Sequence, residues 1–364
     1  MIALLVGVSA AMAVHALHQE WVSLPRTRAQ YLADPDGVLM AAGVDGPSLS
    51  AARMVFANRL FDGGPSATFA LANSLAAVLL IGVVAPIGIA LTANGFTLKK
   101  ASSIGLILIA AICAAALVAT RSRSGLIAAL VGLTWCALLV RRETRDRGQG
   151  QRLLVSGLLL LVLSPLLLAG LAFVGDAEWL AAAPASLQFR LQYWIATIQM
   201  LFDHPLFGAG PGGFQAMYLQ YRSPQANETI ADPHNFLFET MASGGWIAGG
   251  LLAAIFALLV RYRVCLLGAV TRDEEAPPAN QDDARWLAYA VVIGAFLMLV
   301  MIWAIGIQID VEAGIFAVPI GMVVAWFVLR QLPDRRQGRL LGVVAATLAA
   351  VLVHLLVSGG WTVP

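Results

Sequence analysis

Long apolar stretches alternate with short polar segments along the whole chain. Nine of these stretches approach the ~20 residues that a helix needs to cross about 30 Å of hydrocarbon. Alternating strands of about ten residues, the pattern of a membrane β-barrel, are absent. The nine expected spans are residues 1–17, 69–93, 101–119, 124–140, 153–174, 236–260, 286–307, 313–329 and 339–357. The pattern therefore predicts an all-α integral membrane protein with about nine transmembrane helices.

Composition agrees with this prediction and excludes several other classes of protein. Of 364 residues, 59% are hydrophobic and 12% are charged, about half the charged share of a soluble domain. The net charge of +2 gives no reason to expect a nucleic-acid partner. Cys113, Cys136 and Cys265 lack the spacing of a disulfide framework or a zinc site. We expect no metal.

The distribution of Lys and Arg predicts the orientation of a single polytopic domain, 1–364. If residue 18 lies outside, most of the 23 Lys and Arg residues fall in the loops of one side, which is then cytoplasmic. That side includes the loop 261–285. The longer segments 18–68 and 175–235 lie outside. Residues 1–17 suit a membrane helix better than a signal peptide, because they lack a basic start, and both readings leave residue 18 outside.

The second outer segment, 175–235, has features of regular structure and is more than a linker. Leu187, Leu191, Trp194, Ile198 and Phe202 recur at helical spacing and predict an amphipathic helix over 185–203, lying along the membrane surface. The glycine-rich run LFGAGPGGF follows it and permits tight turns. We expect a lid-like loop.

The sixth expected span has a recognisable start signal. Asp232 is a good N-cap and Pro233 suits the first helical position, so His234 and Asn235 would fall in the first turn. The helix N-terminus disfavours a protonated imidazole, whereas Asp232 favours it. The sequence leaves open which effect prevails.

Four basic side chains on the outer side are candidates for chemistry: Arg121 and Arg123 in a short turn, Arg190 on the amphipathic helix, and His234. Alone, each has an ordinary reading, since arginines flanking spans reach headgroups and interface histidines are commonly hydrogen-bonded. Together they suit one task. Two guanidinium groups neutralise a diphosphate, and a neutral imidazole accepts a proton from an attacking hydroxyl. No nucleotide-binding motif is present, so we expect no cofactor.

Three segments resemble conserved motifs of the O-antigen ligase superfamily, a group of membrane glycosyltransferases. They are TRSRSGLIAALVGL at 120–133, FRLQYWIATIQMLFDHPLFGAGPGGF at 189–214 and DPHNFLFETMASGGWIAGG at 232–250. ATFALANSLAAVL at 67–79 is similar to a fourth motif, with Ala72 where proline is usual. The motifs occur in the family's order, and the resemblance extends over about residues 60–330.

The resemblance implies transfer of a glycan from a polyprenyl-diphosphate carrier to an acceptor hydroxyl, on the periplasmic face of a bacterial inner membrane. The large loop 175–235, with its amphipathic helix, would then be periplasmic. By position, Arg123 and Arg190 would bind the diphosphate and His234 would act as the base. We expect substrate binding to involve a further set of residues, Arg121, Tyr218, Asn235 and Glu239. The implied partners are the lipid-linked glycan, a lipid or glycan acceptor, and membrane lipids.

Alternatives remain within and outside this family. A polymerase of O-antigen or exopolysaccharide would share the motifs, and a flippase of the same lipid-linked glycan would also use basic outer residues as a docking site. A flippase predicts charged residues within its spans, and these spans contain few. Family members usually have more spans and no counterpart of 18–68, so we expect a chain shortened at its N-terminus, with its own activity open.

Overall fold

The computed structural model describes residues 1–44, 51–69, 71–92, 101–143, 177–224, 226, 230, 232–270, 311–331 and 339–358. Within these ranges the regular structure is helical and contains no strand, as the apolar pattern predicts. The expected spans 153–174 and 286–307 lie outside the described residues.

The helices follow the order of the apolar stretches, with additional helices in the two outer segments. They are α1 (Ile2–His18), η1 (Gln19–Ser23), α2 (Leu24–Ala33), α3 (Pro35–Ala41), α4 (Ala51–Asp62), α5 (Ala72–Thr92), α6 (Ala101–Ala119), α7 (Arg123–Glu143), α9 (Ala177–Asp203), α10 (Phe214–Tyr221), α11 (Phe236–Val270), α13 (Val311–Gln331) and α14 (Arg339–Ser358).

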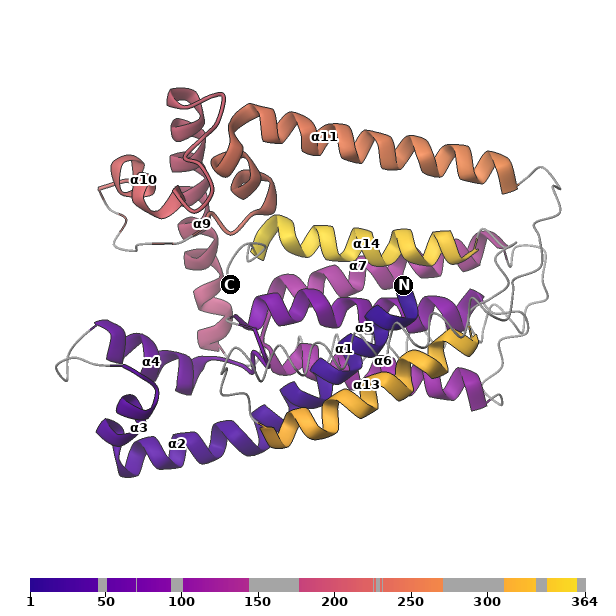
Figure 1. The fold of residues 1–364 in the computed structure, drawn as a ribbon, viewed down its shortest axis with the longest axis horizontal. Coiled ribbons are helices and arrows are strands. Elements are labelled where there is room, and N and C mark those ends of the chain that lie inside the picture. The colour runs from indigo at the N-terminus through magenta and orange to yellow at the C-terminus, as the bar shows by residue number, and fades with distance from the viewer. Residues whose placement is uncertain are drawn as a thin grey trace.

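A bundle of roughly aligned helices forms the body of the molecule (Figure 1). α5 lies at its centre and packs against α1, α6, α7 and α14, while α13 packs along α1. Four described helical stretches are long and apolar enough to cross a membrane: Ile2–Ala33, Ala72–Leu91, Ala101–Ala119 and Phe236–Leu258. Shorter apolar stretches coincide with three other expected spans: Arg123–Leu138, Ala317–Gln331 and Gly342–Ser358. These apolar helices indicate a membrane protein; the number nine stays a prediction.

Small residues allow the bundle helices to approach closely. A Cβ added at Gly7 of α1 would lie 2.5 Å from the carbonyl oxygen of Gly321 and 2.7 Å from Cβ of Ala325, both on α13. A Cβ added at Gly82 of α5 would lie 2.5 Å from Sγ of Cys113 on α6. Such small-residue contacts are the usual means of close packing between membrane helices.

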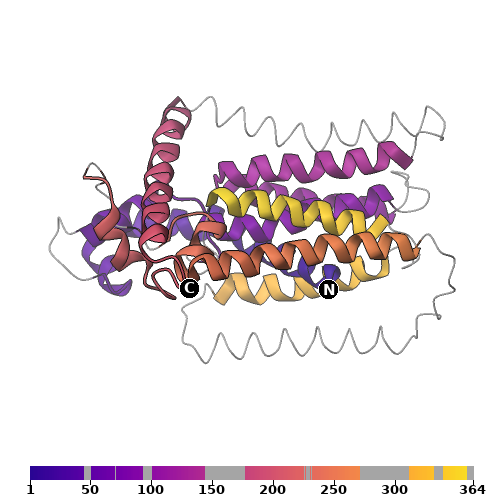
Figure 2. The same ribbon diagram turned by 90° about the horizontal axis from the view of Figure 1, so that it is seen from above.

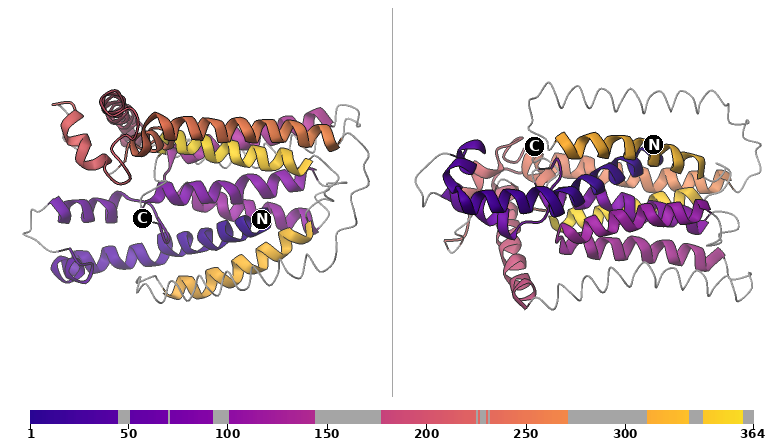
Figure 3. Two further views of the ribbon diagram at one scale, coloured as in Figure 1. Left: turned by 45° about the horizontal axis from the view of Figure 1, so that its top comes forward. Right: turned by 90° about the horizontal axis from the view of Figure 1, so that it is seen from below.

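The first outer segment, 18–68, is largely helical. The helix of α1 continues through the π-helical turn η1 into α2, and α3 and α4 then fold back beside it; we call α2–α4 the N-terminal lobe (Figures 1 and 3). Arg28 donates through Nε to the Leu60 carbonyl at 2.7 Å, fastening α2 to the end of α4. These polar helices have no long apolar period, so their stability depends on tertiary contacts of this kind.

The second outer segment contains the predicted amphipathic helix. It is observed as α9, which begins earlier than expected and runs across the ends of the bundle helices instead of along them (Figure 2). α10 follows it. α11 continues to Val270, inside the expected cytoplasmic loop 261–285, and residues 271–285 lie outside the described part.

Candidate active site

Both outer segments adjoin the same end of the bundle, which we call the site end. Helices α1, α6 and α14 end here, and helices α5, α7 and α11 begin here. α9 runs across these helix ends (Figure 1). The predicted site residues come together at this end from segments far apart in the chain.

Arg123 is placed by a tight turn between α6 and α7. Thr120 Oγ1 donates to the Leu117 carbonyl at 2.6 Å, ending α6. Ser122 Oγ accepts from the Gly125 N–H at 3.3 Å, which caps the N-terminus of α7. Arg123 is therefore the first residue of α7, held on a backbone with little freedom.

Arg121 points to a different neighbour. It adopts a left-handed backbone, φ 55°, and donates through Nη1 to the Asp62 carbonyl at 3.2 Å. That carbonyl belongs to the last residue of α4. The structure thus gives Arg121 a contact with the N-terminal lobe, where the sequence had suggested substrate binding.

Arg190 lies on α9, in electrostatic range of Arg123. Burial of the guanidinium and then the positive charge of Arg123 lower the pKa of Arg190. An effect of one charge on the other is expected only where two like charges are within electrostatic range. The pair forms a concentrated positive site at the end of the bundle.

The start of α11 differs from the prediction. The helix begins at Phe236, and its cap is Asn235, whose Oδ1 accepts from the N–H groups of Leu237 at 2.9 Å and Phe238 at 3.3 Å. The expected cap at Asp232 was wrong, because His234 has a left-handed backbone, φ 52°, that no helix contains. Asn235 also donates through Nδ2 to the Leu356 carbonyl of α14 at 2.8 Å, so both ends of its amide have structural partners.

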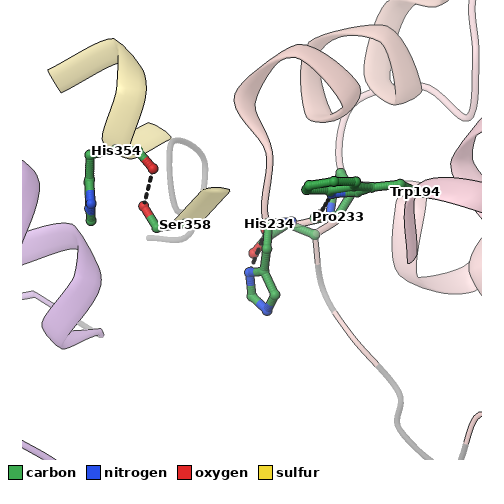
Figure 4. A network of polar contacts seen from close by, with 6 residues as sticks. Trp194, Pro233, His234, His354 and Ser358 are labelled. Carbon is green, nitrogen blue, oxygen red and sulfur yellow. Dashed lines mark hydrogen bonds and ion pairs between the residues drawn. The ribbon is translucent and has the colours of Figure 1, made fainter. Parts of the chain in front are cut away.

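Asp232 does not cap α11; its carboxylate binds His234. Its Oδ1 accepts from the His234 backbone N–H at 2.7 Å and lies 3.0 Å from Nδ1 of the same ring (Figure 4). The Asp232 carboxylate is buried, while the His234 ring is one-third exposed. Since a carboxylate only accepts, the neutral form of the ring carries its proton on Nδ1 and presents the Nε2 lone pair.

Two neighbouring residues of α9 support the His234 turn. Trp194 donates through Nε1 to the Pro233 carbonyl at 3.1 Å (Figure 4), and the Tyr193 ring packs edge-on against His234, 5.9 Å between centroids. Tyr218 of α10 packs edge-on against Tyr193, also at 5.9 Å, and is fully buried. This places Tyr218 in the packing behind the histidine.

An interruption in the helical backbone of α11 contacts the loop that follows α9. Gly244 and Gly245 have non-helical backbone, and the Trp246 N–H beyond the break donates to the Pro205 carbonyl at 2.7 Å. Gly245 has φ 65°, and a Cβ there would collide with the Leu206 carbonyl. The loop after α9 and the glycine pair of the sixth span therefore lie in direct contact.

A known family model matches a segment of the chain that includes much of the site end. Residues 107–255 match the family model described as O-antigen ligase. Over these residues the chain is similar to the O-antigen ligase family. The matched segment contains Arg123, Arg190 and His234, together with Asp232 and Trp194 that place the histidine. No curated protein and no solved structure matched the chain.

Glu239 also lies in the O-antigen ligase segment, one turn into α11. Its side chain is buried at 4% exposure. A carboxylate in a helix of this apolar character is costly unless it faces a partner or a wet site. Its part in substrate binding stays a prediction.

His354 is a residue that sequence reasoning missed. It lies on α14, outside the O-antigen ligase segment, and is fully buried, with Nε2 2.8 Å from the Asn73 carbonyl of α5. The charge of Arg190 and the backbone of Ser124 both act on its ring. The apolar pattern of the span marks a helix and carries no signal for this position.

Proposed function

We propose that the chain transfers a glycan from a polyprenyl-diphosphate carrier to an acceptor hydroxyl. The observation that carries the proposal is the convergence of Arg123, Arg190 and His234 on the site end. Arg123 and Arg190 repel each other, and Tyr193, on the same helix as Arg190, packs against His234. The match of residues 107–255 to the O-antigen ligase family model supports the same class of reaction.

The reaction needs one bond formed and one broken. The acceptor oxygen attacks the anomeric carbon of the glycan, and the bond from that carbon to the diphosphate oxygen breaks, leaving the diphosphate on the lipid carrier. The hydroxyl proton passes to Nε2 of His234. Arg123 and Arg190 stabilise the negative charge that develops on the leaving diphosphate, through bidentate hydrogen bonds.

Asp232 fits this role of His234. Its carboxylate fixes the ring through Nδ1 and so directs the Nε2 lone pair outward. It also stabilises the imidazolium that forms when the proton is accepted. Neither arginine requires protonation changes, so the chain's own residues supply charge and base in this scheme.

We place this site on the periplasmic face of a bacterial inner membrane. Support comes from basic residues at the opposite end of the bundle, such as Arg330, whose guanidinium lies 3.9 Å above the Trp326 ring near the end of α13. An excess of basic residues marks the cytoplasmic side. The carrier's diphosphate would then meet Arg123 and Arg190 at the outer surface.

The decisive experiment removes the base from the full-length protein. His234→Ala, assayed in lipid nanodiscs with a lipid-diphosphate-linked glycan, should release free carrier about 10²–10⁴-fold more slowly than the unaltered chain. Product is measured as glycan-modified acceptor and free polyprenyl diphosphate, which appear together in a transfer reaction.

His204→Ala is the matched control, because His204 is an exposed histidine at the end of α9, in the same outer segment. It should retain transfer. Full activity in His234→Ala, or glycan movement across the membrane without release of carrier, would exclude the proposed reaction; the second result is the one a flippase gives.

A further inference from the structure

The first outer segment has no role in the proposed reaction, yet its end lies against the turn that carries Arg123. We call residues 62–67 the lobe end, because they begin at the last residue of α4 and lead back to the bundle (Figure 1). A Cβ added at Gly64 would lie 2.6 Å from the Ala119 carbonyl oxygen and 2.9 Å from the Thr120 carbonyl oxygen. Glycine permits this close approach of two backbones because it has no side chain.

A hydrogen bond joins the same two segments. Arg121 donates through Nη1 to the Asp62 carbonyl at 3.2 Å. Its own backbone is left-handed, φ 55°, a conformation that persists in a residue with a side chain only where the surroundings enforce it. The acceptor is a backbone carbonyl, so the bond depends on where the lobe end lies and not on the charge of a partner.

The lobe end is fixed in turn from α1. Gln19, in the π-helical turn η1, accepts through Oε1 from the N–H groups of Ser66 at 3.0 Å and Ala67 at 2.8 Å. Ala67 also has a left-handed backbone, φ 50°. Single π-helical turns are frequent at functional sites. The lobe end is therefore held on one side by η1 and supports the Arg121 turn on the other.

We propose that Arg121 and Gly64 are positioning residues for Arg123. Arg123 is the first residue of α7, and the residue between it and Arg121 is the buried Ser122. A turn held against the lobe end keeps the Arg123 guanidinium in the orientation that bidentate binding of a diphosphate requires. The inference rests on the proposed function, because it assumes that Arg123 binds diphosphate. It gives a role to a segment that precedes the matched residues 107–255.

A cycle of double substitutions separates positioning from direct binding of substrate and from a general loss of stability. Gly64→Ala crowds the turn without changing a charge, and Arg121→Met removes the donor but keeps a long side chain. Each is made in the full chain, alone and together with Arg123→Lys, and transfer per folded molecule is measured in nanodiscs. Gly43→Ala is the matched control, because Gly43 also lies in the N-terminal lobe and a Cβ there meets no atom within 4 Å.

Gly64→Ala and Arg121→Met should each slow transfer about 10–10²-fold, and neither should slow it further when residue 123 is already lysine. Gly43→Ala should leave transfer unchanged. Because Arg121 is exposed, Arg121→Met decides the matter if Gly64→Ala does not fold.

The opposite results overturn the inference in distinguishable ways. An equal further loss in the Arg123→Lys chain would mean that these residues act on substrate or on the fold independently of Arg123, and the proposed function would stand. Unchanged transfer in either single variant would remove the positioning role of that residue. Unchanged transfer in Arg123→Lys alone would overturn the proposed role of Arg123 and the inference with it.

Discussion

The interior of the bundle is joined through small apolar residues, whereas the site end is joined through hydrogen bonds of turns and loops. α1 crosses α13 at Gly7 and Gly321 with backbone almost in contact. At the site end, all three non-glycine residues with left-handed backbone in the described ranges occur together: Ala67, Arg121 and His234. Strained backbone of this kind persists where the surroundings enforce it, commonly at functional sites.

This difference between the bundle interior and the site end suggests that substitutions can change stability without changing activity, and the reverse. The bundle requires close packing and tolerates few added atoms. The site end requires particular polar groups in fixed positions. Substitutions in the two regions should therefore change different measured quantities, and the predictions that follow test this in order of expected effect.

The largest effect is expected at the arginine pair. Arg123→Lys and Arg190→Lys keep the positive charge but lose the planar donor pair, so each should slow glycan transfer about 10²–10³-fold, with unchanged melting temperature. Arg59→Lys is the control, since Arg59 is exposed in the N-terminal lobe. Equal losses in all three variants would mean that the pair has no special role. Transfer is measured as release of free carrier.

The next effect is expected inside the bundle. Gly7→Ala places a Cβ against the Gly321 carbonyl, and we expect the free energy of unfolding to fall by about 1–3 kcal/mol. Transfer per folded molecule should not change. Gly250→Ala is matched to it, because a Cβ at Gly250 of α11 has no atom within 4 Å. Thermal unfolding followed by tryptophan fluorescence should separate the two variants; the same melting temperature for both would contradict close packing at Gly7.

The bundle is also the region that the sequence predicts best. Residues 1–17, 69–93 and 101–119 are helices close to their expected limits, because a long apolar stretch in lipid has few alternatives. The N-terminal lobe was expected only as a loop. Its helices depend on contacts such as Arg28 with the Leu60 carbonyl, which join residues far apart in the chain and leave no local pattern.

The sequence indicated which residues to consider for the site and did not indicate how the structure holds them; their chemical roles stay predictions. Motif resemblance identified Arg123, Arg190 and His234, which the structure brings to one end of the bundle. The cap of α11 was assigned to Asp232, because Asp-Pro is a common helix start; the left-handed His234 moves the cap to Asn235. His354 was missed because its neighbour Asn73 comes from the other end of the sequence.

A smaller effect is expected where the two regions meet, at the break in α11. Gly245→Ala forces a side chain into left-handed backbone and against the Leu206 carbonyl, at a cost of about 1–2 kcal/mol from the backbone alone. Because α11 carries the His234 turn, both melting temperature and transfer should fall. Gly210→Ala also puts a side chain on a residue of positive φ, 79°, but with open space around its Cβ. A fall in transfer equal to that of Gly245→Ala would show that crowding at the break is unimportant.

The smallest effect concerns the tie between α9 and α10. The Tyr221 hydroxyl donates to Oδ2 of Asp203 at 2.9 Å, and this bond, followed by burial and the Asp203 charge, raises the pKa of Tyr221 above its usual value. A raised folded-state pKa stabilises the protein fully below about pH 10 and ceases to do so as the pH rises through the folded-state value.

Tyr221→Phe removes this contribution. Its melting temperature should lie slightly below that of the unaltered chain near pH 8, and the two should converge above about pH 10. A constant difference across this range would mean that the hydroxyl acts through packing instead of the bond to Asp203. Since the bond between Tyr221 and Asp203 is exposed, the expected difference in melting temperature is small. A small effect is what we expect if many separate hydrogen bonds join the elements of the site end. The nearest atoms to a Cβ at Gly7 belong to the Gly321 backbone and to Ala325, which do not titrate, so Gly7→Ala should show no matching pH dependence.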